Sequence, residues 1–215
     1  MYEENEVLHA LCTRRSVRKY DTARQVEPEK IQAVLTAGQY APTGRNRMST
    51  KFVVIQNPDL LHRLSKQNAE IMGAPEADPF YGAPVAILVL ADSTVHTWVE
   101  DGSLAMGAML NAAYAVGLGS CWIHRARETF DSESGKALLE EWNIPTQYRG
   151  IGFCILGYAD GALPQPIPRK DDQIFLEIGQ YHRKRHFFCC AVKIGAAVFL
   201  PKFCAFFCPF CRKKV

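Results

Sequence analysis

The sequence predicts one domain in which helices cover both faces of a β-sheet, followed by a tail of different composition. Three observations support this prediction. The length of 215 residues fits a single domain. With 48% hydrophobic and 22% charged residues, the chain can fill a core. Amphipathic stretches of helical length also alternate with short apolar stretches of strand length.

Five segments show the apolar spacing or the boundary residues of helices. The first has Val7, Leu8, Leu11 and Cys12 on one stripe, and the second opens on Pro28 as a first-turn proline. The fourth is rich in small residues, which permit close helix packing, and it is a candidate central or dimer-interface helix. The expected helices are Glu3–Cys12, Pro28 to Gly38 or Tyr40, Asp59–Met72, Trp98–Val116 and Ser132–Trp142.

Four shorter apolar stretches predict the strands, at Lys51–Gln56, Pro84–Ala91, Cys121–His124 and Gly150–Gly157. The unbroken apolarity of Pro84–Ala91 indicates a strand that is covered on both faces. Gly73–Gly82 is rich in proline and glycine, so it is expected to form a loop and is a candidate lid.

Charge and cysteine divide the chain in two. Of the 25 Lys and Arg residues, eight lie in Gly179–Val215, which has no Asp or Glu. Met1–Ile178 therefore keeps 17 basic and 22 acidic residues, a formal charge of −5 against +8 for the tail. Only three of the eight cysteines lie in the body, too few and too scattered for a disulfide framework. With an acidic N-terminus in place of a secretory signal, these features predict a cytoplasmic protein.

Several common chemistries are excluded by the motifs. The sequence has no phosphate-binding P-loop, no dinucleotide-binding glycine motif and no serine nucleophile elbow. The four histidines of the body have no partner at metal-ligand spacing, so no metal site is predicted. The remaining candidate is an anion-binding site that is built from side chains.

A basic segment after the first helix is the candidate for that site. Arg14, Arg15 and Arg18 fall within five residues, with Ser16 between them. One interpretation is a solvated helix end, where basic side chains suit the C-terminal dipole. The other is a clamp on a phosphate or an anionic ring, because guanidinium groups bind such groups through two parallel hydrogen bonds.

This segment, RRSVRKY, resembles the opening motif of the FMN-dependent nitroreductase family. Four further segments agree with that family in order and spacing, and the resemblance covers about Leu8–Ile178. They are Ala41–Asn46 (APTGRN), Lys51–Gln56, Gly117–Ile123 (GLGSCWI) and the basic Pro168–Lys170. The resemblance implies an α+β fold with a mostly antiparallel sheet flanked by helices on both faces, and an intertwined homodimer that binds FMN at its interface.

The resemblance also implies a role for each site residue. Arg14, Arg15 and Ser16 would hold the FMN phosphate and ribityl chain, and Arg18 would approach N1 and O2 of the ring. Arg169 and Lys170 would return to the phosphate. The second subunit would contribute Pro42, Thr43, Gly44 and Asn46 to the same flavin. Ile123, His124 and Arg125 would line the inner face of the flavin ring, and Asn68 would touch the flavin.

The implied activity is an NAD(P)H-dependent oxidoreductase that passes electrons to nitroaromatics, quinones or similar acceptors by a ping-pong mechanism. No catalytic side chain is assigned, because the flavin carries the hydride chemistry. Two departures from the family stand out. Arg47-Met48-Ser49 replaces the usual continuation x-Gln-Pro, and His124-Arg125 replaces an acidic residue and glycine, which favours anionic substrates.

Three alternatives to this function stay open at this point. The protein could belong to a flavin-processing or dehalogenating branch, or it could bind flavin without turnover as a sensor or carrier. Nucleic-acid binding by the basic tail would show steep salt dependence, but the acidic body argues against it.

The tail Gly179–Val215 lies outside the resemblance, and its first interpretation is an extension with no evolved role. Contact with an anionic membrane surface comes second. The spacing of Cys204, Cys208 and Cys211 also matches iron–sulfur and glutaredoxin patterns, but the surrounding domain that either would need is missing.

Overall fold

The computed structural model describes residues 4–175. The chain divides into two compact units, Met1–Ile167 and Pro168–Val215, and each is described by itself. Within the second unit the described segment contains one short 3₁₀ helix, η2 (Asp171–Gln173). The tail that begins at Gly179 lies outside the described residues, so the interpretations of that tail stay predictions. The same holds for the predicted domain boundary after Ile178.

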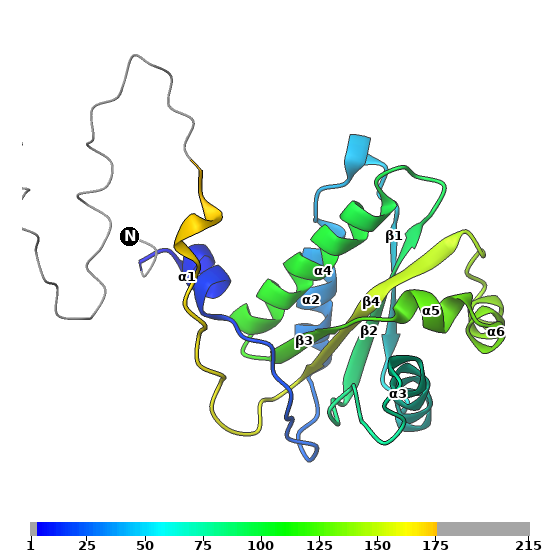
Figure 1. Ribbon diagram of the computed structural model, residues 1–215, viewed down its shortest axis with the longest axis horizontal. Helices are drawn as coiled ribbons and strands as arrows, with labels where there is room; N and C mark the ends of the chain where they lie inside the picture. Colours follow the sequence, from blue (N-terminus) through cyan, green and yellow to red (C-terminus); the bar gives the residue numbers. More distant parts are fainter. Residues whose placement is uncertain (1–3, 176–215) are drawn as a thin grey trace, which may run out of the picture. The chain divides into compact units, whose positions relative to one another are not determined.

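A four-stranded sheet forms the centre of the first unit (Figure 1). The strands are β1 (Thr50–Ile55), β2 (Val85–Asp92), β3 (Gly119–Ile123) and β4 (Tyr148–Gly157). Their order across the sheet is β1-β2-β4-β3, and every neighbouring pair is antiparallel. The expected antiparallel α+β architecture is thereby confirmed.

Six α-helices and one 3₁₀ helix accompany the sheet in this unit. The helices are α1 (Glu6–Thr13), α2 (Pro28–Gln39), α3 (Pro58–Met72), α4 (Trp98–Ala115), α5 (Ala126–Asp131) and α6 (Glu133–Glu141), with η1 at Gly44–Asn46. Asn5, Asn57 and Ser132 cap three of them, because each side chain accepts a free backbone N–H of the first turn. Gly73 ends α3 with a φ of 76°, which glycine adopts without steric penalty.

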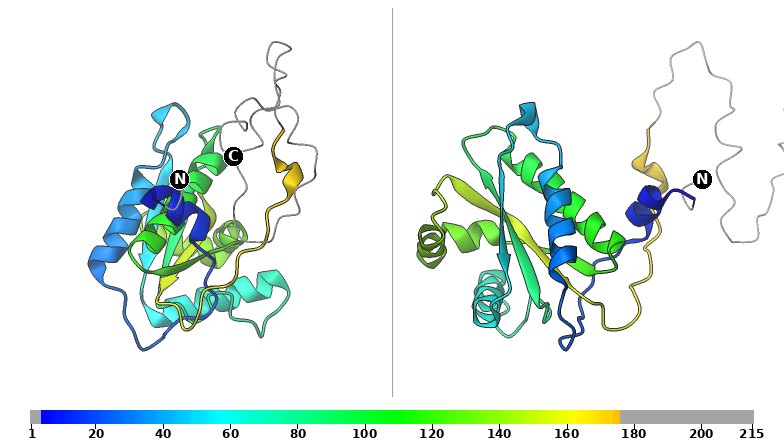
Figure 2. Two further views of the ribbon diagram at one scale, coloured as in Figure 1. Left: turned by 90° about the vertical axis from the view of Figure 1, so that its left-hand side faces the viewer. Right: turned by 180° about the vertical axis from the view of Figure 1, so that it is seen from behind.

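Two hydrophobic cores lie on opposite faces of the sheet. On one face, α2 and α4 pack side by side against the strands (Figure 2). On the other face, α3, α5 and α6 supply Leu64, Phe130 and Leu139 to the second core. Successive residues of β2 enter the two cores in turn, because side chains alternate between the faces of a strand. The prediction that this strand is covered on both faces is therefore confirmed.

A glycine in β4 makes room for a large side chain of the neighbouring edge strand. A Cβ atom on Gly152 would lie 2.2 Å from Nε1 of Trp122 in β3. That indole Nε1 is buried and has no hydrogen-bond partner within the described residues. The close contact fixes the indole against the sheet, next to the face that carries α2 and α4.

Two local expectations differ from the structure. The first helix has its expected apolar stripe, but Val7 is 69% exposed and Leu11 is 51% exposed, so the stripe is not packed within the described chain. The segment before Ser132 forms the extra helix α5, which the sequence analysis did not anticipate. Among residues 4–175, no helix has both the length and the apolarity to cross a membrane.

Candidate functional site

The basic segment after α1 lies along the edge strand β3. Ser16 forms a bridge with Ser120, and the backbone N–H of Val17 donates to the Ser120 carbonyl at 3.0 Å. Farther along, Tyr20 pairs with Ala159, and its buried hydroxyl donates to the Val17 carbonyl at 3.0 Å. Burial raises the pKa of the Tyr20 hydroxyl, so this hydroxyl stays a neutral donor. The segment is thus held firmly against the sheet.

The three arginines of this segment have no carboxylate partner within the described residues. Arg14 and Arg15 are half-buried and Arg18 is exposed. The ion pair nearest in sequence joins Lys19 to Asp160 at 2.7 Å and leaves the guanidinium groups uncompensated. Because a half-buried charge is costly without a counter-charge, this cluster favours binding of an anion.

Arg15 has features of both interpretations of the basic segment, the cap on a helix end and the clamp on an anion. Its Nη1 donates to the carbonyl oxygens of Cys12 at 2.9 Å and Arg14 at 2.7 Å, so it caps the end of α1. Its Nε is buried and has no partner among the described residues. Because buried donors in folded proteins normally have a partner, this atom is a candidate contact for a bound acceptor.

Asn68 provides an unpaired acceptor near the end of β3. Its side chain is fully buried in α3, and its Nδ2 donates to the His124 carbonyl at 2.7 Å. The amide orientation is fixed by this bond, because a carbonyl oxygen cannot donate. Oδ1 is then a buried acceptor that has no donor in the described chain. An unpaired buried acceptor costs stability, so this atom is a candidate contact for a ligand N–H or O–H.

The residues that follow β3 are partly accessible. His124 is exposed and Arg125 is half-buried, with a φ of 70° at the start of α5. The carbonyl of Arg125 accepts both the backbone N–H and the hydroxyl of Thr129, which holds this turn. The side chain of Ile123 points into the core beside α3, so only its backbone is available to a ligand.

Beneath β3, burial raises the pKa of the Cys154 thiol to about 12. This thiol is therefore a protonated core group and not a reactive thiolate. Cys121 is likewise buried, and the three described cysteines are free thiols.

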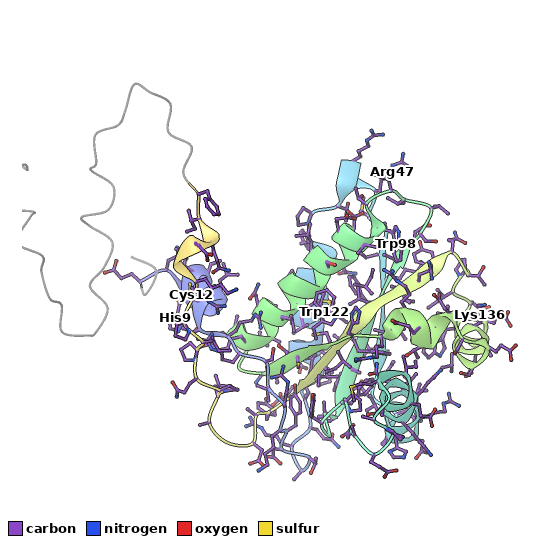
Figure 3. All side chains as sticks on the ribbon, viewed as in Figure 1. His9, Cys12, Arg47, Trp98, Trp122 and Lys136 are labelled. Atoms are coloured by element: carbon purple, nitrogen blue, oxygen red, sulfur yellow. The ribbon has the colours of Figure 1, made fainter. Side chains whose placement is uncertain are left out.

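The loop that carries Pro42, Thr43, Gly44 and Asn46 lies at the opposite end of α4 from the basic segment. Gly44 donates its N–H to Asp101 at 2.8 Å, whereas the end of α1 is tied to Tyr114 by the Thr13 hydroxyl at 3.0 Å. Asp101 and Tyr114 are separated by 13 residues of one helix, about 20 Å at 1.5 Å per residue. Figure 3 shows Arg47 and Cys12 near opposite ends of the same helix.

One copy of the chain therefore brings together only part of the predicted site. Ser16, which follows Arg14 and Arg15, bridges Ser120 near the start of β3, and Asn68 bonds to the His124 carbonyl just after its end, while the 42–46 loop lies elsewhere. Arg169 and Lys170 are exposed residues of the second unit, and their predicted return to the phosphate stays a prediction.

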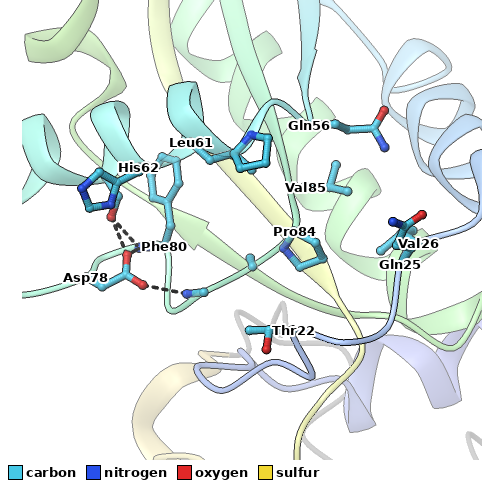
Figure 4. A pocket seen from close by; sticks show the side chains of 14 residues that line it. Thr22, Gln25, Val26, Gln56, Leu61, His62, Asp78, Phe80, Pro84 and Val85 are labelled. Carbon is cyan, nitrogen blue, oxygen red and sulfur yellow. Dashed lines mark hydrogen bonds between the residues drawn. The ribbon is translucent and has the colours of Figure 1, made fainter.

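A cavity of the first unit does not coincide with these residues (Figure 4). It has a volume of about 660 Å³ and lies between the start of α3, the end of β1 and the loop before β2. Asp78 is its single carboxylate, and its oxygens already accept hydrogen bonds from Ser65, Phe80 and Gly82. No Lys or Arg is among the lining residues, so the cavity lacks the chemistry of an anion site.

A buried carboxylate in α4 was missed by the sequence analysis. Asp101 is 2% exposed and accepts from Gly44 and from the Ser49 hydroxyl. A signal was present, because Asp101 precedes the core residues Ala105 and Met109 at intervals of four and shares their helix face. A carboxylate on a core stripe needs partners, and the nearby polar loop could supply them.

Comparisons with known proteins identify the family and support the fold. The model of the nitroreductase family matches residues 11–158. A protein from Archaeoglobus fulgidus is 33% identical over 159 residues, covering 71% of this chain and 85% of the relative. A protein from Methanothermobacter thermautotrophicus is 36% identical over 126 residues, covering 54% of this chain and 60% of its own length. Both carry the provisional name NADH dehydrogenase/NAD(P)H nitroreductase.

Among solved structures, a nitroreductase with bound FMN from Bacteroides fragilis superposes with a TM-score of 0.74 at 28% identity. The superposition covers 81% of this chain and all of the other chain. The match to the family model extends over more than half of the sequence, from the end of α1 to the residue after β4. The chain therefore belongs to the nitroreductase family.

Proposed function

We propose that the protein is an FMN-dependent oxidoreductase that oxidises NAD(P)H and reduces nitroaromatic, quinone or similar acceptors. One observation carries the proposal. Two sets of unpaired polar atoms are tied to the two ends of one strand, β3. Arg14 and Arg15 directly precede Ser16, which bridges Ser120, and Asn68, whose Oδ1 is unpaired, bonds to the His124 carbonyl. Their anchor points, Ser120 and His124, are four residues apart, about 13 Å along an extended strand.

The groups of FMN match this arrangement of unpaired atoms. FMN is an elongated molecule with a phosphate at one end and a ring that carries an imide N–H at the other. Arg14, Arg15 and Ser16 would hold the phosphate and ribityl chain, and the buried Nε of Arg15 would gain an acceptor. The Oδ1 of Asn68 would accept a ring N–H, so both unpaired atoms would be satisfied by one ligand.

The rest of the proposed site surrounds the ring. Arg18 would lie near N1 and O2, where a fixed positive charge favours negative charge on the ring. The turn at His124 and Arg125 would present backbone N–H groups along the inner face, following Ile123. Arg169 and Lys170 would add positive charge at the phosphate.

A second copy of the chain would complete the site. Pro42, Thr43, Gly44 and Asn46 lie at the far end of α4 from the basic segment, so they reach a flavin only if it is held by another copy. The proposal therefore includes a homodimer with two equivalent sites.

When bound, FMN would supply the redox chemistry, in which NAD(P)H and then the acceptor react in turn by a ping-pong mechanism. The residues of this chain would bind and orient the cofactor and tune its charge, and none needs to act as an acid or base. The names of the two archaeal relatives and the FMN of the Bacteroides fragilis structure support this assignment.

Purification and cofactor exchange test the proposal. We expect a yellow protein that releases FMN on denaturation and oxidises NADH or NADPH when a nitroaromatic or quinone is present. A colourless protein that gains no flavin absorbance from added FMN would refute it. FMN binding without NAD(P)H oxidation would indicate a sensor or carrier. Turnover without nitroaromatic or quinone reduction would indicate a flavin-processing or dehalogenating branch.

We further propose that Met1–Ile178 is the functional domain, in the cytoplasm, and that Gly179–Val215 is dispensable. A chain that ends at Ile178 should bind FMN as tightly as the full chain. A loss of binding in the shortened chain would contradict this part of the proposal.

A further inference from the structure

The carboxylate of Asp101 has a setting that the binding roles above do not explain. It is 2% exposed, and no ion pair of the described residues includes it. Its Oδ1 accepts the backbone N–H of Gly44 at 2.8 Å, and its Oδ2 accepts the hydroxyl of Ser49 at 2.7 Å. These donors lie 57 and 52 residues away in sequence, at the two ends of one short loop. A single buried side chain thus joins both ends of the 44–49 loop to α4.

The loop itself has a backbone that its residues do not favour. Arg45, Asn46 and Met48 have φ values of 53°, 53° and 48°, in the left-handed region. Asparagine tolerates this region, but for arginine and methionine it is unfavourable. Such a conformation persists only when the surroundings enforce it.

The surroundings do enforce it at several points. Within the loop, Thr43 accepts the N–H of Met48 on its hydroxyl at 3.0 Å and the N–H of Asn46 on its carbonyl at 3.0 Å. Against α4, a Cβ on Gly44 would lie 2.2 Å from the Thr97 hydroxyl, so the loop sits tightly on the start of the helix. The Asp101 carboxylate is the link between these local bonds and the core.

We infer that Asp101 is a positioning residue for the flavin site. By holding Gly44 and Ser49, it fixes the strained loop in the conformation in which Thr43 and Asn46 reach the FMN held by a second copy. Asp101 does not touch the cofactor. The inference rests on the proposed function, since it gives the loop a ligand to contact.

The hydrogen bond from the Ser49 hydroxyl to Asp101 depends on a residue in which this sequence differs from the family pattern. In the family pattern that the chain resembles, the third residue after the loop asparagine is proline. Ser49 occupies that position, and a proline has no hydroxyl to donate to Asp101. Within the changed Arg47-Met48-Ser49 sequence, Ser49 therefore adds a second hydrogen bond to the buried Asp101 carboxylate.

Four variants of the full-length protein test the inference. Asp101→Ala removes both bonds, and Ser49→Ala removes one and covers the case in which Asp101→Ala does not fold. Asp101→Asn is the conservative variant, because its Oδ1 can accept from Gly44 while its Nδ2 donates to the Ser49 oxygen. Met106→Ala is the matched control, since Met106 is a fully buried residue of α4 that faces the α2 core.

Two measurements are made on each folded variant. The first is amide hydrogen exchange of a peptide that covers residues 42–49 in the FMN-free protein. The second is the Kd for FMN from quenching of flavin fluorescence. Asp101→Ala should speed exchange of the loop and raise the Kd about 10-fold or more, because the competent loop conformation becomes a minor one. Ser49→Ala should act in the same direction with a smaller change, and Asp101→Asn should stay within about 3-fold of the parent protein.

The outcomes separate the inference from the proposed function. If the parent protein does not bind FMN, the proposed function fails. If the parent binds FMN but Asp101→Ala and Ser49→Ala bind it equally well, the positioning role is overturned. Met106→Ala and Asp101→Ala are compared where both lower the Tm to a similar extent. The positioning role is also overturned if Met106→Ala then weakens FMN binding and speeds loop exchange as much as Asp101→Ala does. Faster loop exchange and weaker binding in the Asp101 and Ser49 variants alone would support the inference.

Discussion

Replacing Asn68 with leucine separates a ligand-binding role of this side chain from a structural one. In the protein without FMN, the change removes the bond to the His124 carbonyl, which is worth about 0.5–1.5 kcal/mol. It also removes the buried unpaired Oδ1, whose burial costs about 1–3 kcal/mol. Leucine has the same number and branching of side-chain heavy atoms but is larger, so the two effects partly cancel, and the free energy of unfolding of the FMN-free protein should change by no more than about 3 kcal/mol.

FMN binding should weaken in addition. The bound ring N–H would lose its acceptor and face leucine, at a cost of about 1–3 kcal/mol, which corresponds to a Kd raised roughly 5- to 150-fold. Fluorescence titration with FMN gives the Kd, and urea denaturation of the FMN-free protein gives its stability. Gln67→Leu is the matched control, because Gln67 lies next in sequence and bonds instead to Ser132 and Ser134. If Asn68→Leu binds FMN as tightly as Gln67→Leu, the assignment of Asn68 is wrong.

Three further predictions concern charge, packing and pH. Arg14→Ala and Arg18→Ala should each raise the Kd for FMN about 10-fold, because each removes a charge-assisted contact, and dialysis should then strip the flavin. Gly152→Ala should lower the free energy of unfolding by about 1–3 kcal/mol, because its Cβ would collide with the Trp122 indole. Burial raises the pKa of the Cys154 thiol to about 12, above the ordinary value of a free thiol. Stability from this thiol is therefore fully present below the ordinary pKa of a thiol and decreases as the pH rises toward 12. Raising the pH from 8 to 10 should lower the free energy of unfolding more in the parent protein than in Cys154→Ala.

Each of these predictions has a result that would contradict it. Arginine variants that keep a full complement of FMN through dialysis would show that the basic segment does not hold the phosphate or the ring. An unchanged urea midpoint for Gly152→Ala would mean that the indole can move away without loss. Parallel pH profiles for Cys154→Ala and the parent protein would mean that the thiol is not buried as the structure shows.

Sequence periodicity was sufficient to locate most of the elements. The residues that open α2 and α3, Pro28 and the Asn57-Pro58 pair, act locally, and so does the glycine that ends α3. The order of the strands could not be derived in this way, because the pairing of β2 with β4 joins residues more than 55 positions apart. The antiparallel sheet was expected only from the family resemblance. The six residues of α5 are too few to show helical periodicity, so that helix was missed.

The site was predicted with similar limits. The motif around Arg14 and Ser16 was found because its residues are adjacent in sequence, and the structure adds that it lies along β3. The unpaired state of Asn68 is a property of packing, which no motif shows. Asp101 was missed because its partners lie more than 50 residues away. The sequence could not show that the 42–46 loop and the basic segment lie at opposite ends of α4, because that depends on how distant segments pack.

The alternation of β2 between the two cores has a consequence for unfolding. Because Ile87 and Leu88 are neighbours in one strand yet belong to opposite cores, neither core can come apart while the strand keeps its place. If water entered the core on one face, β2 would shift and the side chains that it contributes to the other core would lose their packing. We therefore expect heat to melt the two layers in a single cooperative transition, with the calorimetric and van't Hoff enthalpies equal.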